Sequence, residues 1–217
     1  MQLLSVNVGQ VQPIRHGKPS GKAGIFKLPQ TEPVNITPLG LEGDAIVDTE
    51  NHGGLDQAVY IFTLPDYEWW SNHIGRPLPP GIFGENLTIS DLASATLCIG
   101  DRLQVGHVLL EVTSPRVPCV TIAARMEDPQ FVKKFRHAEK PGVYCRVIET
   151  GAVIVNDPVT LIPYQGIRVT ALEFFRAFYQ HDLTEEQLLR FLAVPIPTKS
   201  RPYYEDRLAM LTGSATP

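Results

Sequence analysis

Cys119 is the residue whose sequence surroundings depart most from those of a packed core thiol. It follows Pro118 directly and lies three residues after Arg116, in the stretch SPRVPC. The prolines at 115 and 118 keep this stretch out of regular structure, and a nearby guanidinium can lower the pKa of a thiol. A thiolate attacks electrophiles and binds soft metals. The residues alone are equally compatible with a reactive Cys119 and with a small core side chain.

The other two cysteines, Cys98 and Cys145, each lie in a β-prone run and are expected in the core. Three cysteines without CxxC spacing do not form the pattern of a disulfide framework, which favours a cytoplasmic compartment. The six histidines show no ligand spacing with the cysteines, which argues against a zinc site.

Two lysines, Lys22 and Lys27, flank a glycine-containing turn in GKAGIFK, residues 21–27. Such a loop can present ammonium groups and backbone N–H groups to a phosphate. The spacing is not that of a P-loop, so a nucleoside-triphosphate site is not predicted. A solvated loop without a ligand is the alternative.

Two further polar clusters precede strands. In NHGGLDQ, His52 comes before Gly53 and Gly54, which allow the backbone to approach a ligand closely, and His52 and Gln57 could then donate to it. His52 could equally be an ordinary turn residue.

In the second cluster, GIFGENLTI, Glu85 and Asn86 stand at the mouth of a strand. In that position they could orient a substrate or cap a turn.

Composition indicates a globular protein. The chain has 217 residues, 43% of them hydrophobic and 19% charged, with a net charge of −4. This charge argues against a nucleic-acid or membrane-surface binder. The first residues do not resemble a signal peptide, and no apolar run is long enough to span a bilayer.

Short β-prone runs separated by Gly, Pro and Asp dominate the chain up to residue 163, which favours a barrel or sandwich over a βαβ fold. Gly106-His107 predicts a tight hairpin. Helices are predicted near 65–74 and over 121–137, the second with a break at Pro129. Strands are predicted at 3–8, 57–62, 85–89, 101–106, 107–113, 142–148 and 152–162.

The pattern changes after Pro163, and residues 164–217 are predicted to form a small three-helix domain beside the main domain of residues 1–163. Thr184 and Gln187 form a capping box, and Ser200 can cap the last helix. A helix-turn-helix reader of DNA is not favoured, because six cations balance six anions in this segment. The cations are Arg168, Arg176, Arg190, Lys199, Arg201 and Arg207; the anions are Glu173, Asp182, Glu185, Glu186, Glu205 and Asp206.

Eight motifs occur in a fixed order: GKAGIFK, GLEGD, NHGGLDQAVY, FGENLT, IGD, SPRVPC, GVYCRV and NDPV. In this order they closely resemble the MOSC domain, the module named after the C-terminal part of molybdenum-cofactor sulfurases. The resemblance covers most of residues 1–163, and the helical tail is similar to that of the YiiM-like branch. It implies a mainly β fold, a closed β-barrel of the pyruvate-kinase-barrel-like type with peripheral helices.

The resemblance also implies a role for Cys119, either as the thiolate ligand of a pterin-bound molybdenum or as a persulfide that carries sulfur. On the first alternative the cofactor is molybdopterin. Its phosphate would be held by Lys22, Lys27 and Arg116, while the HGG and FGEN motifs would contact the pterin or the metal's oxo ligands. The residues in or beside these two motifs that would make the contacts are His52, Gly53, Gly54, Gln57 and Asn86. His52 or Glu85 would supply a proton.

The implied activity is reduction of N-hydroxylated bases or related compounds to amines. No flavin, nicotinamide or iron–sulfur motif is visible, so an electron-donor reductase is expected as a partner, and a homodimer is possible. Two departures from the family pattern stand out: Ala23 occupies a position that often bears a hydroxyl, and Gln57 one that is often lysine. A sulfurtransferase and a non-catalytic module that binds a phosphorylated small molecule are the alternatives.

Overall fold

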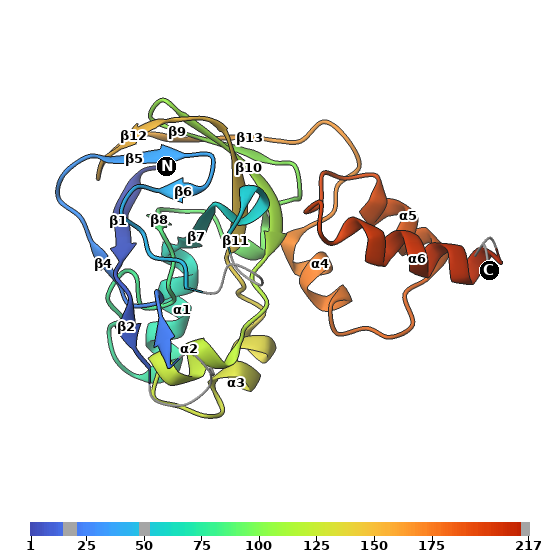
Figure 1. Cartoon of the computed structure of the whole chain (residues 1–217), viewed down its shortest axis with the longest axis horizontal. Helices are drawn as coiled ribbons and strands as arrows, with labels where there is room; N and C mark the ends of the chain where they lie inside the picture. The colour runs from blue at the N-terminus through green and yellow to red at the C-terminus, as the bar shows by residue number, and fades with distance from the viewer. Residues whose placement is uncertain (15–20, 48–52, 214–217) are drawn as a thin grey trace.

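The computed structural model describes residues 1–14, 21–47 and 53–213. Its centre is an eight-stranded sheet in the order β13-β9-β10-β11-β7-β8-β1-β4 (Figure 1). All neighbours in this sheet are antiparallel except β7 and β8, which run parallel. The strands are β1 (Leu3–Gly9), β4 (Lys27–Pro29), β7 (Val59–Thr63), β8 (Leu87–Ile89), β9 (Arg102–Val105), β10 (Val108–Pro115), β11 (Val143–Glu149) and β13 (Val159–Ile162).

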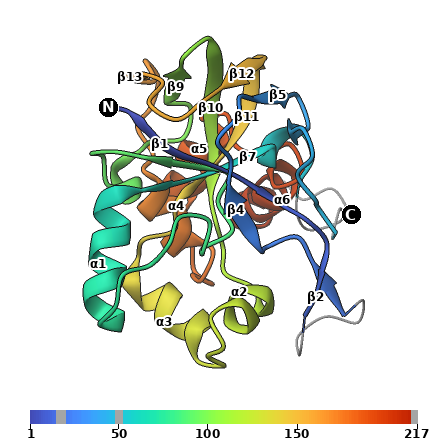
Figure 2. The same ribbon diagram turned by 90° about the vertical axis from the view of Figure 1, so that its left-hand side faces the viewer.

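Two smaller sheets lie beside the central one. A three-stranded sheet has the order β12-β5-β6, and β2 pairs with β3. In Figure 2 the β2–β3 ribbon projects away from the main sheet, on the side opposite α1. These strands are β2 (Gln12–Pro13), β3 (Lys22–Ala23), β5 (Val34–Thr37), β6 (Gly40–Leu41) and β12 (Gly151–Val153).

The predicted closed barrel is wrong, because the central sheet is open: β4 and β13 are its two edges and do not pair with each other. The start of β1 does reach the turn before β13, but only through an isolated bridge between Gln2 and Pro158. At the other edge β4 has three residues and ends at Pro29, which lacks the N–H group that a further ladder needs.

The other predicted strands and helices are confirmed, except that the run 152–162 is divided into β12 and β13, which belong to different sheets. β9 and β10 form the expected hairpin, in which Gly106 adopts a φ of 55°. The predicted helix 121–137 is divided, as expected at Pro129, into α2 (Val120–Arg125) and α3 (Phe131–Ala138), and α1 covers Leu64–Ile74. Short 3-10 turns, η1 (Leu55–Gln57) and η2 (Ser94–Thr96), complete this part of the chain.

An aromatic cluster fills the space between the sheet and helices α1 and α3. Phe62 of β7 stacks on Phe83 with ring centroids 4.4 Å apart, and Trp70 of α1 lies 5.0 Å from Phe131 of α3. All four side chains are buried. Burial of this much aromatic surface fixes the two helices against the sheet and supports the strands that lead to the pocket described below.

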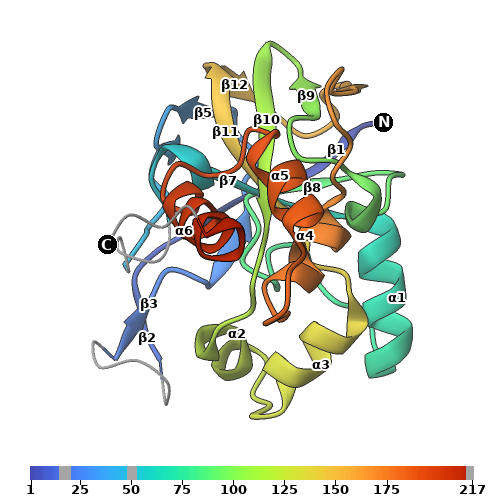
Figure 3. The same cartoon turned by 90° about the vertical axis from the view of Figure 1, so that its right-hand side faces the viewer.

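The C-terminal helices are α4 (Ala171–Ala177), α5 (Glu185–Leu192) and α6 (Arg201–Thr212), and they gather on one side of the sheet, in front of β10 in Figure 3. Most of their buried residues belong to the same hydrophobic cluster as the sheet: Phe174, Leu188 and Phe191 share it with Leu110 and Val112 of β10. α4 packs directly against β10, and α5 and α6 pair with each other and extend the same cluster. The division at residue 163 stays a prediction.

The capping box of α5 is formed as predicted, and it offers a test of the helical unit. Gln187 N–H donates to the Thr184 hydroxyl at 3.2 Å, and Thr184 N–H donates to the Gln187 side chain at 2.9 Å. Ser200 occupies the N-cap of α6 but makes no side-chain capping bond.

We expect Thr184→Ala to lower the free energy of unfolding by about 1 kcal/mol, and Ser200→Ala to change it by only a few tenths. Urea unfolding of both variants would contradict this interpretation if the two losses were equal.

Candidate functional site

One pocket gathers most of the polar residues that the sequence singles out. It encloses about 690 Å³ of empty space, part of it open to solvent. Loops and strand ends that are distant in sequence converge on it, from the β2–β3 region to the start of α2. The sequence-predicted residues in its wall are Lys22, Lys27, Gly53, Gln57, Asn86, Arg116 and Cys119.

Cys119 stands at the N-cap of α2, where β10 has ended and the helix begins. Its backbone is extended, with a φ of −120° and a ψ of 172°, and its side chain is half-buried. Cys98 and Cys145 are buried instead, and burial raises the pKa of each thiol. The prediction that these two cysteines are core residues is confirmed, and Cys119 is the cysteine that faces the pocket.

Arg116 forms a charged part of the pocket wall although it is almost fully buried. One terminal nitrogen donates to the Phe83 carbonyl, and the guanidinium lies 5.0 Å from the ring centre of Tyr60. Burial alone would lower the pKa of Arg116, but the neighbouring Tyr144, Tyr60 and Cys119 side chains raise it above the ordinary value. The site therefore contains a permanent positive charge close to Cys119.

Two buried polar atoms in this wall have no hydrogen-bond partner among the described residues. They are Nε of Arg116 and the hydroxyl oxygen of Thr121. Buried donors are normally satisfied, since leaving one without a partner costs about 1–3 kcal/mol. Because both groups lie in the pocket lining, a polar ligand bound there would satisfy them.

Lys27 is held by an acidic partner within the protein. Its ammonium group forms an ion pair with Asp44, and the two side chains are 9% and 5% exposed. Asp44 also accepts from the Asn86 side chain at 2.9 Å and from Gly9 N–H at 2.8 Å. Burial lowers the pKa of Lys27, and the Asp44 carboxylate partly offsets this effect. Because its charge is already compensated by Asp44, Lys27 is less suited to hold a phosphate than Arg116.

Asn86 is likewise engaged with the protein. Its side-chain oxygen accepts from Tyr60 N–H at 3.1 Å, while its amide nitrogen contacts Asp44. Asn86 thus ties β8 to β7 and to the 44–47 turn. It lines the pocket, but its bonds are those of a residue that shapes a wall.

Glycines let the backbone come close at two places in the wall. A Cβ on Gly24 would lie 1.9 Å from the Ala45 carbonyl oxygen, and Gly84 has a φ of 76°. Side chains at these positions would push the strands apart or narrow the pocket. Gly53 lines the pocket, whereas Gly54 precedes η1 and is not part of the lining. His52 lies outside the described residues.

Glu85 is fully buried and does not line the pocket. One carboxyl oxygen accepts from Tyr67 at 2.5 Å, from Gly81 N–H at 2.6 Å and from Thr88 at 2.9 Å. Burial raises the pKa of Glu85. Its role as a direct proton donor stays a prediction, and the three residues that donate to it, Tyr67, Gly81 and Thr88, do not line the pocket either.

Sequence reasoning missed four of the polar side chains in the lining: Asp44, Tyr60, Thr121 and Tyr144. Asp44 could have been singled out, because it is the last residue of the GLEGD motif. Its ion pair could not, because its partner Lys27 lies in a different motif. Tyr60 and Tyr144 pair across β7 and β11, with ring centroids 4.9 Å apart. Both were expected only as strand residues, and strand pairing was needed to place them together.

The described residues offer no protein-built metal site, because no three His, Cys, Asp or Glu side chains come together among them. Nor does any helix in this part of the chain have the length and apolar character needed to cross a membrane. Among the described residues, the pocket lining contains one thiol, cationic side chains and two buried polar atoms that lack a hydrogen-bond partner. That set suits an anionic organic ligand that brings its own metal better than a bare cation.

Comparison with known proteins places this pocket in a family context. The family model described as the MOSC domain matches residues 48–160, more than half of the chain. The protein YflK of Bacillus subtilis, whose name describes it as uncharacterized, is 32% identical over 180 residues, which are 83% of this chain and 81% of that one. The crystal structure of YiiM from Geobacillus stearothermophilus superposes with a TM-score of 0.78 at 26% identity, covering 96% of this chain and 99% of that one.

A third relative bears the name of an enzyme. A protein of Gibberella moniliformis named "Reductase" is 31% identical over 170 residues. These are 75% of this chain but only 30% of the fungal protein, so the name belongs to a much longer chain.

The Lys27–Asp44 pair predicts a large stability effect. Asp44→Ala would leave a buried ammonium group without its counter-charge and two further donors without an acceptor. We expect a loss of about 3–5 kcal/mol in the free energy of unfolding, measured by urea titration. The control is Glu205→Ala, which removes an exposed partner 3.8 Å from Arg201 and is expected to cost less than about 1 kcal/mol. Equal losses would mean that the Asp44 pair does not hold the structure together.

The raised pKa of Glu85 predicts a pH dependence of stability. The native state keeps this proton to a higher pH than the unfolded chain, whose carboxyl titrates near about 4.3. The protonated carboxyl therefore contributes stability that is fully present below that pH and is lost as pH rises toward the native pKa. Relative to Glu85→Gln, which stays neutral, the parent protein should become less stable between about pH 4 and pH 7. Urea unfolding at both pH values tests this, and parallel curves for the two proteins would contradict it.

Proposed function

Because the chain belongs to the MOSC domain family, we propose that it is an oxidoreductase that binds the molybdenum cofactor and reduces N-hydroxylated bases or related compounds to amines. The family and the reductase name of one relative support oxidoreductase chemistry. The similarity to YiiM over nearly the whole chain supports a complete site on this one polypeptide. The finer identity of cofactor and substrate is the proposal.

The observation that carries this proposal is the position of Cys119. It is the one half-buried cysteine of the three, and it lines the same pocket as Arg116 and Lys22. A thiolate is a good ligand for a thiophilic metal. Cationic side chains beside it would hold the phosphate of a pterin, and the guanidinium offers planar, bidentate recognition.

The residues present fit such a cofactor. The Arg116 Nε and Thr121 hydroxyl atoms are buried in the pocket wall and have no hydrogen-bond partner in the described part of the chain, as expected of donors that a polar ligand satisfies. At Gly24, Gly53 and Gly84 the wall carries no side chain, and a Cβ at any of these positions would lie within 3.0 Å of a neighbouring atom. Lys22 and Arg116 would hold the phosphate, while Lys27 stays bound to Asp44 and fixes the wall.

The proposed overall reaction is R–NHOH + 2 e⁻ + 2 H⁺ → R–NH₂ + H₂O. The cofactor, when bound, supplies the two-electron chemistry and the acceptor for the oxygen atom. Cys119 would hold the metal, and Tyr60 and Tyr144 would line the substrate's side of the pocket as flat, largely apolar surfaces that suit a ring system. Electrons would come from a separate reductase, since the sequence contains no flavin, nicotinamide or iron–sulfur motif.

The proposal predicts molybdenum that depends on Cys119. The chain would be produced in a host that makes the cofactor, together with Cys119→Ser and a matched control, Cys98→Ser, which changes a buried thiol outside the pocket. Elemental mass spectrometry should find near-stoichiometric molybdenum in the parent and the control. In Cys119→Ser it should fall at least about tenfold, as removal of a ligand implies.

Three other outcomes would count against the proposal. If all three proteins lack molybdenum while the parent carries an added sulfur on Cys119 in its intact mass, the chain is a sulfur carrier. If molybdenum is equal in the parent and in Cys119→Ser, the thiol does not bind the metal. A phosphorylated ligand retained equally by both proteins, without metal, would indicate a non-catalytic binding module.

A further inference from the structure

The 3-10 turn η1 lies between the pocket and the C-terminal helical unit. Gln57, at its end, and Gly53, just before it, line the pocket. Asp56, in its middle, is bonded instead to residues on the other side. The three residues of η1 thus contact both the pocket wall and a C-terminal segment that lies about 140 residues further along the chain.

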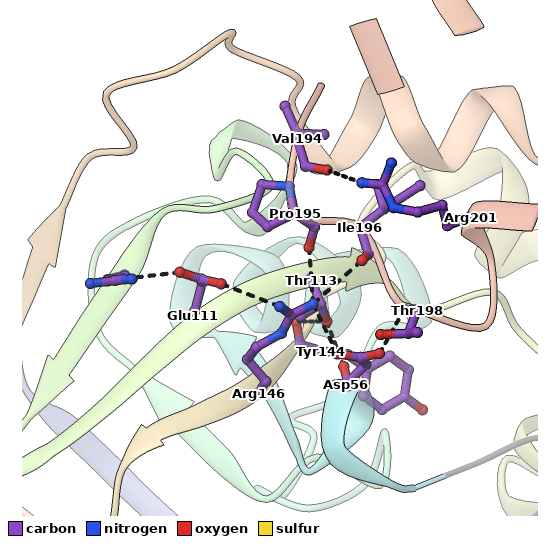
Figure 4. Close-up of polar contacts among 11 residues, drawn as sticks. Asp56, Glu111, Thr113, Tyr144, Arg146, Val194, Pro195, Ile196, Thr198 and Arg201 are labelled. Atoms are coloured by element: carbon purple, nitrogen blue, oxygen red, sulfur yellow. Dashed lines mark hydrogen bonds and ion pairs between the residues drawn. The ribbon is translucent and has the colours of Figure 1, made fainter. Parts of the chain in front are cut away.

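Asp56 is fixed by contacts from three different segments (Figure 4). One carboxylate oxygen lies 2.8 Å from a terminal nitrogen of Arg146 on β11, and the other accepts from Thr198 N–H at 2.7 Å. The Asp56 carbonyl accepts from the Thr113 hydroxyl on β10 at 2.6 Å. With its backbone and its side chain both held, this residue determines where η1 sits.

Arg146 extends the same network into the tail. Its terminal nitrogen donates to the carbonyls of Pro195 and Ile196 at 3.1 and 3.4 Å, as Figure 4 shows. Its other terminal nitrogen lies 3.6 Å from Glu111 on β10. Bonds from a guanidinium to a carboxylate and to carbonyls are charge-assisted and directional, so they define geometry as well as adding stability.

The segment that Arg146 binds is itself well anchored. Val194 and Ile196 are 1% and 3% exposed, and both belong to the hydrophobic cluster shared by sheet and helices. Arg201, at the start of α6, donates to the carbonyls of Leu192 and Val194 at 3.1 and 3.3 Å. The segment 194–198 therefore presents fixed carbonyl and N–H groups to Arg146 and Asp56.

We propose that Asp56 and Arg146 are positioning residues that couple docking of the C-terminal helical unit to the shape of the pocket. Docked helices hold η1 where Gln57 and Gly53 complete the wall. By thermodynamic linkage, a ligand that binds the completed pocket stabilises the docked helices to the same degree. The identity of that ligand rests on the proposed function, whereas the coupling between helices and pocket wall does not.

A matched pair of variants separates this role from simple anchoring. Asp56→Ala removes the acceptor of both Arg146 and Thr198. Arg168→Gln removes another ion pair between the tail and the sheet, 2.6 Å from Arg168 to Asp101, whose two residues do not line the pocket. If Asp56→Ala does not fold, Asp56→Asn keeps the side-chain size and removes only the charge.

Hydrogen–deuterium exchange of the full chain without cofactor is the direct test. Asp56→Ala should speed exchange of residues 53–60 on the order of tenfold, the effect of losing one hydrogen bond to a charged group, and should also speed exchange of residues 194–200. Arg168→Gln should speed exchange around residues 164–170 but leave residues 194–200 and 53–60 unchanged, because its ion pair with Asp101 lies outside the contacts of Asp56 and Arg146. Equal effects of the two variants on residues 53–60, or no effect of either, would overturn the coupling.

A second readout concerns the ligand. At a temperature well below the melting points of both variants, Asp56→Ala should retain about tenfold less molybdenum than Arg168→Gln, because only the first loosens the pocket wall. Equal retention would overturn the link to ligand binding. If the parent protein holds no molybdenum at all, the proposed function fails, but the exchange experiment still decides whether Asp56 positions η1.

Discussion

The ion pair between Lys27 and Asp44 is the interaction on which the architecture of the pocket depends. Asp44 has no regular element of its own, yet it contacts the side chains of Lys27 on β4 and Asn86 beside β8, and the backbone of Gly9 at the end of β1. These strands are neighbours at one edge of an open sheet. A buried carboxylate with three donors costs much to desolvate, and it is stable only while all three donors stay in place. The requirement to satisfy one charge thus specifies the relative positions of three strand ends.

Arg116 imposes a related constraint on the pocket wall. Its guanidinium is buried against Tyr60, and it is tied to the Phe83 carbonyl beside the aromatic cluster under the sheet. The core and the pocket are therefore not independent: the rings that pack α1 against the sheet also fix the backbone to which the charged residue is bonded. A site built on strands and a packed aromatic layer keeps its geometry better than one built on loops alone.

Much of the local structure could be predicted from the sequence, because it is encoded within short segments. The β9–β10 hairpin needed only Gly106 between two alternating runs, and the start of α5 needed only Thr184 and Gln187. The composition of the site was also predictable, since Cys119, Arg116 and Lys22 all line one pocket. Closure of the sheet was not, because it depends on whether β4 and β13 meet, and their own residues say nothing about that. The partner of Lys27 was missed for the same reason: the pairing of distant charges follows from the fold.

The shared hydrophobic cluster of sheet and helices has a consequence for how such chains evolve. Phe174, Leu188 and Phe191 complete a core that the sheet begins, and the 194–198 segment adds polar bonds to it. A unit of this kind is not a detachable module, because deleting it would uncover apolar strand surface on β10. Descendants that lost the helices would have to acquire polar residues on that face of the sheet, and lineages that gained them would have to do the reverse. The polarity of the strand residues that face the helical unit should therefore differ between relatives that have the unit and relatives that lack it.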